Sequence, residues 1–398
     1  MPESDRSLLV VGPFREEATH CIQEAAAAVG VAVAQVGRCE DIVAAVAEAL
    51  PLAIVLRMDA HGAEHACAHV RSQARLAQVP IFGVTSESSD LAFTELFVWG
   101  GDDLVGIASP QAIVRRLRAL LTHAPGMGPR AAAAGAAAAP PAGSVPPKGQ
   151  AVIAGPVARW RSVMGRALYN GGYGVRFAGT TDALAEEALS EGVRVVVVSD
   201  DLQPDGAGAA LADARGRGSQ AAWVLVAPPK RMAEANAALA SLGRASAMDG
   251  FAPPENVLFV VNELLAARGI DKRASPRLLY GTTVAFRVAG RNEDEIGFSY
   301  NVSAGGAYVR TLAPPEPGQD MWLDMWPPRS ERRVRLAGRV AWRRPFGPVG
   351  GATVPPGFGI QLTDGLAGDL DRWRAGCNTF ADSLLRIRVA RHVEPPDE

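Results

Sequence analysis

Two arginines and a polar turn are the residues of this chain best suited to chemistry. Arg273 and Arg277 lie four positions apart, and Asn301, Ser303 and Gly306 follow them along the chain. A guanidinium group is a planar fork of donors that fits a phosphate, or the O6/N7 edge of guanine, at two points. Asn301 offers an amide, Ser303 a hydroxyl and Gly306 room for close backbone approach. The alternative interpretations are a solvated basic segment and an ordinary glycine turn.

These residues lie in a part of the chain where apolar and polar residues alternate. From residue 270 onward, alternating runs cover residues 282–288, 306–311, 321–326, 332–344 and 358–362, with turn-rich segments between them. Such a pattern predicts a small antiparallel barrel or sandwich. Residues 366–385 then repeat apolar side chains at spacings of three and four, which predicts one helix that packs by a single face.

The order and spacing of the two motifs resemble the PilZ domain, whose pattern is RxxxR followed by [DN]xSxxG. The resemblance covers residues 271–386, and both motifs are complete. It implies a receptor for cyclic di-GMP that binds the ligand through Arg273, Arg277, Asn301, Ser303 and Gly306 and needs no further cofactor. Asn301 stands where an aspartate is common in the family, which removes one charge from the site.

The chain before the barrel reads as two α/β domains joined by a linker. Continuous apolar runs such as residues 52–58 and 193–200 alternate with helical patterns, which indicates parallel sheets covered on both faces. The predicted architecture is a doubly wound domain over 1–124, an Ala/Pro/Gly linker over 125–149, a second doubly wound domain over 150–269, and a β-barrel with a C-terminal helix over 270–390.

Both α/β domains resemble the receiver domains of response regulators, with signature residues missing. The family's acidic pair falls on Gly12–Pro13 and on Gly155–Pro156, and its phospho-acceptor falls on Arg57 in the first copy and on Asp200 in the second. The resemblance therefore implies two degenerate receivers that serve as interaction modules. The alternative is a phosphorylation-driven response regulator that uses Asp200, with a barrel that binds nothing.

Composition excludes several other classes. The chain has 398 residues, a net charge of −2, 48% hydrophobic residues and four scattered cysteines. Nothing approaches the ~18 apolar residues of a membrane span, and the N-terminus lacks a secretory pattern. His61, His65 and His69 favour a solvated helix face over a metal site. We expect a cytoplasmic signalling protein that is not an enzyme, has no nucleic-acid partner, and contacts an unidentified protein or a second copy through its receiver-like domains.

Overall fold

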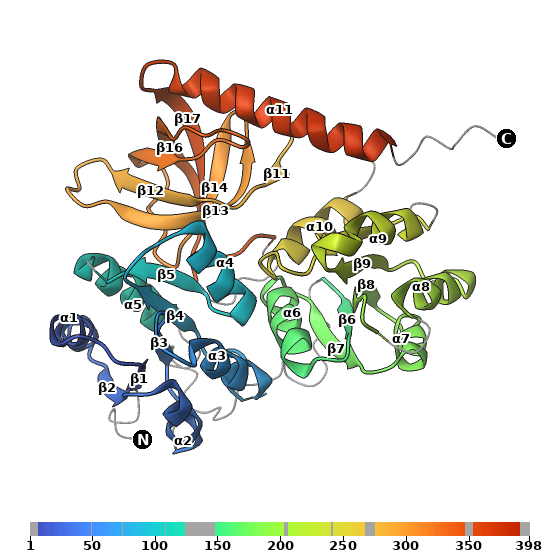
Figure 1. Cartoon of the computed structure of the whole chain (residues 1–398), viewed down its shortest axis with the longest axis horizontal. Coiled ribbons are helices and arrows are strands. Elements are labelled where there is room, and N and C mark those ends of the chain that lie inside the picture. The colour runs from blue at the N-terminus through green and yellow to red at the C-terminus, as the bar shows by residue number, and fades with distance from the viewer. Residues whose placement is uncertain are drawn as a thin grey trace. The chain divides into compact units, whose positions relative to one another are not determined.

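The computed structural model describes residues 7–48, 50–73, 75–107, 109–123, 148–202, 206–239, 242–266, 275–346 and 353–390 (Figure 1). They form two parallel α/β sheets and an antiparallel β-barrel followed by a long helix. This architecture confirms the predicted fold class. The predicted linker 125–149 lies almost wholly outside the described residues, and the exact domain boundaries remain predictions.

The first sheet is parallel, with strand order β2-β1-β3-β4-β5. Its strands are β1 (Ser7–Val11), β2 (Ala32–Val36), β3 (Ala53–Arg57), β4 (Ile81–Thr85) and β5 (Asp103–Gly106). Its helices are α1 (Glu16–Ala27), η2 (Cys39–Asp41), α2 (Ile42–Glu48), α3 (Ala63–Ser72), α4 (Asp90–Trp99) and α5 (Pro110–His123). Buried side chains of α1 and α5 pack on one face, and those of α2, α3 and α4 pack on the other. The central strands are buried on both faces, which explains their continuous apolar sequences.

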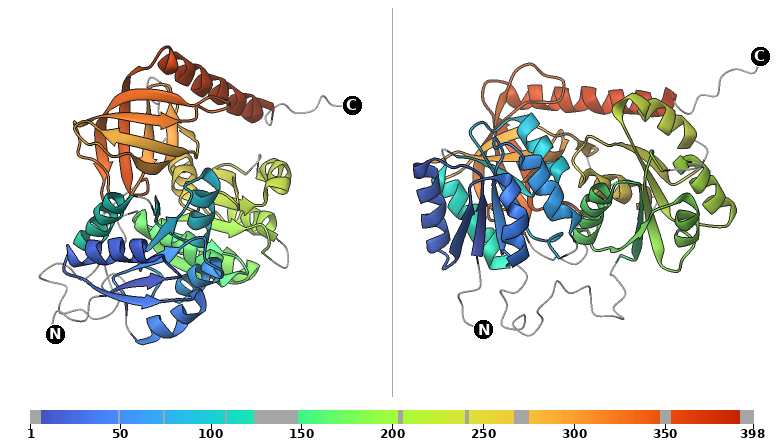
Figure 2. Two further views of the ribbon diagram at one scale, coloured as in Figure 1. Left: turned by 60° about the vertical axis from the view of Figure 1, so that its left-hand side comes forward. Right: turned by 60° about the horizontal axis from the view of Figure 1, so that its bottom comes forward.

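The second sheet repeats this topology, with strand order β10-β9-β8-β6-β7. Its strands are β6 (Gln150–Ala154), β7 (Gly174–Ala178), β8 (Val193–Ser199), β9 (Ala222–Ala227) and β10 (Ala245–Asp249). Its helices are α6 (Ala158–Asn170), α7 (Thr181–Glu187), α8 (Gly206–Gly216), η4 (Pro229–Arg231), α9 (Met232–Leu239) and α10 (Asn256–Leu265). Each sheet lies between two layers of helices (Figure 2).

The barrel closes through six antiparallel strands, with a short seventh strand added beside β13. Going round the barrel, β13 pairs with β12, β12 with β15, β15 with β16, β16 with β17, β17 with β14, and β14 again with β13. The strands are β11 (Leu278–Leu279), β12 (Thr283–Val288), β13 (Glu295–Ser303), β14 (Gly306–Arg310), β15 (Asp320–Met325), β16 (Val334–Arg344) and β17 (Gly357–Gly365). Because β11 and β14 both pair with β13, the backbone that follows Arg277 and the polar turn lie along the same strand.

The C-terminal helix begins three residues later than predicted. Helix α11 (Asp369–Ala390) follows a turn in which Ala367 and Gly368 have positive φ angles, and Leu366 is exposed before it. Asp369 accepts a hydrogen bond from the backbone N–H of Arg335, which fixes the start of the helix on β16. The predicted apolar face is correct further along, where Trp373 and Cys377 are buried.

Candidate functional site

The polar turn of the PilZ-like pattern closes a β-hairpin. Ser303 at the end of β13 pairs with Gly306 at the start of β14, and Gly306 also pairs with Gln361 of β17. A Cβ atom on Gly306 would collide with the carbonyl oxygen of Ile360, so only glycine fits between the two neighbouring strands. The indole N–H of Trp373 donates to the carbonyl of Ser303 at 3.0 Å, so α11 supports the turn.

Arg277 lies beside this turn through the pairing of β11 with β13. Leu278 pairs with Val302 and Leu279 with Asn301, so the antiparallel register sets the backbone of Arg277 next to Ser303. Arg277 is exposed, whereas Asn301 is buried. The structure therefore brings together Arg277, Asn301, Ser303 and Gly306 at one end of the sheet. Arg273 lies outside the described residues, so the first arginine of the motif remains a prediction.

Two aromatic residues, Tyr308 and Trp342, lie across the sheet from Asn301 on neighbouring strands. Asn301 pairs with Tyr308, Tyr308 with Gly359, and Gly359 with Trp342, and residues directly opposite each other share a face. The rings of Tyr308 and Trp342 stack at 4.9 Å, and Trp342 keeps 36% of its surface exposed. The sequence analysis missed this pair, because only the strand register brings two distant aromatic residues together.

Burial shifts the pKa values of two side chains on this face of the sheet. It raises the pKa of Tyr308, which stays neutral, and it lowers the pKa of Arg344, whose side chain is largely buried two residues beyond Trp342 on β16. Arg339 pairs with Gln361 across the sheet and forms an exposed ion pair with Asp320 at 2.8 Å. Arg277, which precedes β11, is exposed as well.

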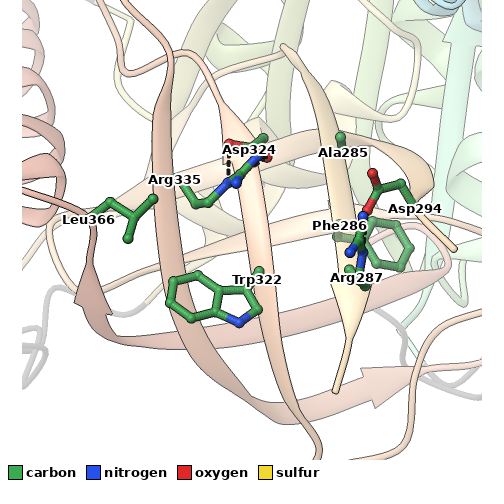
Figure 3. Close-up of a pocket in the computed structure, with 8 residues that line it drawn as sticks. All are labelled: Ala285, Phe286, Arg287, Asp294, Trp322, Asp324, Arg335 and Leu366. Atoms are coloured by element: carbon green, nitrogen blue, oxygen red, sulfur yellow. Dashed lines mark hydrogen bonds and ion pairs between the residues drawn. The ribbon is translucent and has the colours of Figure 1, made fainter. Parts of the chain in front are cut away.

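One hollow of the barrel is lined by paired charges. It measures about 290 Å³ and lies over β12, β15 and β16 (Figure 3). Arg287 contacts Asp294 and Arg335 contacts Asp324, each at 2.7 Å, and the exposed side chain of Trp322 lies beside these pairs. Each of these arginines is matched by a carboxylate, which offsets its attraction for an anionic ligand.

In the first α/β domain, the phospho-acceptor position is filled by an arginine that serves the structure. Nη1 of Arg57 donates to the carbonyl of Pro13 at 2.8 Å, and a Cβ atom on Gly12 would lie 2.9 Å from Cβ of Arg57. The sequence analysis missed Asp59, whose carboxylate accepts from the hydroxyls of Thr85 and Ser86. Burial acts to raise the pKa of Asp59, but these hydrogen bonds outweigh it and hold the pKa below its usual value.

In the second α/β domain, Asp200 follows β8 and contacts the guanidinium group of an arginine. Its Oδ2 lies 2.7 Å from Nη1 of Arg231. The two groups form an ion pair, but their geometry does not meet the angles of a hydrogen bond. Burial raises the pKa of Asp200, against the opposing effect of Arg231. A shallow pocket of about 560 Å³ lies beside it, lined by Asp201, Phe251 and residues 228–231. Across the described ranges, no three His, Cys, Asp or Glu residues gather in a way that could hold a metal ion.

Asp102 and Asp103, where β5 begins, have structural roles. Asp102 accepts from the backbone N–H of Ile81 and pairs with buried Arg71, while Asp103 is buried against Arg116. Among the helices that the structure describes, none is long and apolar enough to cross a membrane.

Comparison with solved structures found several similar chains. An inhibitor of motility from Bacillus subtilis is 19% identical, with a TM-score of 0.24, and the match covers 29% of this chain and 53% of that one, about half its length. The PilZ domain of CeSA from a cellulose-synthesizing bacterium is 17% identical (TM-score 0.20; 28% and 98% covered). The chemotaxis response regulator CheY4 of Vibrio cholerae is 17% identical (TM-score 0.27; 29% and 98% covered). No curated protein matches the chain.

The family assignment covers the C-terminal part of the chain. Residues 271–374 match the model of the PilZ domain, and this range includes both motifs and the six strands of the barrel. The two preceding sheets share the 2-1-3-4-5 strand order of the doubly wound fold to which receivers belong. The chain thus carries a PilZ domain at its C-terminus, after two parallel α/β domains that resemble receivers.

Proposed function

We propose that this chain is a cyclic di-GMP receptor and not an enzyme, and that its PilZ domain binds the ligand through Arg273, Arg277, Asn301, Ser303 and Gly306. The observation that carries the proposal is the pairing of β11 with β13, which sets Arg277 next to the Asn301–Gly306 turn. The ligand carries two phosphodiester charges and two guanines. Arginine recognises both groups by two-point hydrogen bonds, and the amide and hydroxyl of the turn supply further donors and acceptors.

The neighbouring aromatic pair supports the same ligand class. A purine is flat and stacks on aromatic rings and guanidinium planes. Trp342 is partly exposed in the same strand row as Asn301 and is backed by Tyr308, so it offers such a surface beside the turn.

Isothermal titration of the full chain with cyclic di-GMP tests this function. Charge-assisted hydrogen bonds contribute roughly 1.5–3 kcal/mol each, so Arg277→Ala should weaken binding about 10-fold to 100-fold. Ser303→Ala should have a smaller effect. Cyclic di-AMP should bind more weakly, because adenine presents an N6 donor where guanine presents the O6 acceptor.

Arg335→Ala is the matched control. Arg335 is an exposed barrel arginine that pairs with Asp324, away from the turn, so its loss should leave affinity unchanged. Equal affinity of the wild type, the Arg277→Ala variant and the Arg335→Ala variant would show that the site is assigned to the wrong residues. A flat titration of the wild type would refute the receptor function itself.

The proposal includes roles for the rest of the chain. The two receiver-like domains would relay the signal to a protein partner, and a homodimer is one form of that contact. We place the protein in the cytoplasm, where its four free cysteines would stay reduced. The alternative, phosphotransfer to Asp200, is disfavoured by the ion pair with Arg231 and is checked by acetyl-phosphate labelling against an Asp200→Asn control.

A further inference from the structure

The segment that leads from Arg277 into the barrel is held by the first α/β domain. Asp90 lies in the first turn of α4, and one of its carboxylate oxygens accepts from the backbone N–H and the hydroxyl of Thr283, each at 2.6 Å. Its other oxygen accepts from the hydroxyl of Thr282 at 3.1 Å. A single side chain of the degenerate receiver therefore fixes two successive residues of the barrel.

A hydrogen-bond relay continues from these threonines toward Arg277. The N–H of Thr282 donates to Oγ of Ser299 at 2.9 Å, and that hydroxyl donates to the carbonyl of Tyr280 at 2.6 Å. Ser299 in turn donates its N–H to the carbonyl of Thr282 at 2.8 Å. Tyr280 follows directly on β11, whose first residue is the neighbour of Arg277. The relay thus links Asp90 to the backbone that presents the arginine.

Packing reinforces the relay. A Cβ atom on Gly281 would lie 2.7 Å from the ring of Phe298, so the segment runs flat against this side chain. Phe298 stacks on Phe93 of α4 with ring centroids 5.2 Å apart, and it meets the edge of Phe97 at 5.7 Å. Helix α4 therefore supports residues 277–283 both by hydrogen bonds and by a buried aromatic cluster.

We propose that Asp90 is a positioning residue for the ligand site: the first α/β domain pre-orders the segment that carries Arg277, and the affinity of the barrel for its ligand depends on this anchor. The inference rests on the proposed function. A segment that is ordered before the ligand arrives loses less conformational freedom on binding, which strengthens the complex without a new contact. By linkage, the ligand must stabilise the Asp90 contact to the same extent.

The test uses the full chain and two readouts, cyclic di-GMP titration and amide hydrogen exchange. Asp90→Ala should weaken binding about 3-fold to 10-fold, the size expected for the ordering of one or two side chains. It should also speed exchange within residues 277–283 while strands β15 and β16 keep wild-type exchange. Asp90→Asn retains an acceptor oxygen and should recover part of the affinity.

Two further variants separate positioning from loss of stability. Asp41→Ala removes an aspartate that directly precedes helix α2 of the first domain but pairs with Arg38, so affinity should not change. Thr283→Val removes the hydroxyl on the barrel side, and combining it with Asp90→Ala should add little to the loss caused by Asp90→Ala.

The outcomes distinguish this inference from the proposed function. Wild-type affinity in Asp90→Ala overturns the positioning role even if exchange becomes faster. If the wild type does not bind cyclic di-GMP, the proposed function fails, and exchange alone then decides whether Asp90 orders the segment. Unchanged exchange within residues 277–283 overturns the inference in either case.

Discussion

The two α/β domains share one topology and differ in how their last strand and helix are used. In the first domain, α5 contributes Arg116, which is fully buried and binds Asp103 of β5, Glu295 of β13 and the carbonyl of Ile296. In the second domain, the equivalent helix α10 buries Val257, Leu258 and Val261, and its single charged residue, Glu263, is exposed. In the first domain, α5 therefore takes part in a buried ion-pair cluster with β5 and β13, and α10 of the second domain has no counterpart to it.

Two further contacts join the first domain to the barrel. Asp103 also accepts the backbone N–H of Leu312 at 2.8 Å, and Arg310 lies with its guanidinium 3.4 Å from the ring centre of Phe97. The first domain therefore contacts the barrel at the starts of β12 and β13 and at the end of β14. The first domain and most of the barrel belong to one compact unit, whereas the second domain belongs to the other.

Among tests of this comparison, Arg116→Met should give the largest loss of stability. The variant leaves buried Asp103 without its cation and removes one of the partners of Glu295, and breaking a buried pair typically costs about 3–5 kcal/mol. In urea unfolding followed by hydrogen exchange, the first sheet and the barrel should lose stability together, while the second sheet keeps its own. Arg217→Met is the control in the second domain, because this exposed pair contributes about 1 kcal/mol or less. A barrel that stays protected while the first sheet opens would contradict the shared core.

An intermediate effect is expected from Phe298→Leu. The change keeps an apolar side chain but removes two aromatic contacts, which together contribute about 1–3 kcal/mol. Stability should fall in both the first domain and the barrel. Phe251→Leu in the second domain changes an aromatic residue that is 65% exposed, so we expect a change within about 0.5 kcal/mol. Equal losses of unfolding free energy in the two variants would show that Phe298 does not join the first domain to the barrel more tightly than an exposed aromatic residue would.

The smallest and sharpest contrast is a difference in pH dependence. Asp59 has a pKa below its unfolded value, so its ionised form stabilises the fold above about pH 4, and this contribution disappears as the pH falls through the folded pKa. Asp200 has a raised pKa, so its ionisation opposes folding as the pH rises from about 4.

Substitution by asparagine should therefore have opposite effects at neutral pH. Asp59→Asn should lower the stability of the first domain and Asp200→Asn should raise that of the second, each by less than about 1 kcal/mol because both sites are partly solvated. Both differences should shrink toward pH 3 in thermal or urea melts. The same sign for both variants at pH 7 would show that burial does not dominate at Asp200.

Local sequence patterns predicted most of the architecture and missed one decisive strand. Buried parallel strands and half-buried antiparallel strands each leave a direct signature, so both sheets and most of the barrel were predicted correctly. Strand β13 was not, because seven of its nine residues are buried and its sequence does not alternate. Its outer side is covered by helix α4 and by the ion pair between Asp103 and Arg116 of the first domain. No local sequence pattern encodes these contacts.

The sequence by itself determined the residue types of the candidate site and the loss of the receiver signature, because both depend on motifs of a few neighbouring residues. Only the tertiary structure decided that Arg277 lies next to the Asn301–Gly306 turn and that Trp342 and Tyr308 border this turn. It also decided that Asp90 holds the segment that leads from Arg277 into the barrel. These contacts join residues far apart in the chain, and they exist because strand register and domain packing, which are set by the buried core, bring their backbones together.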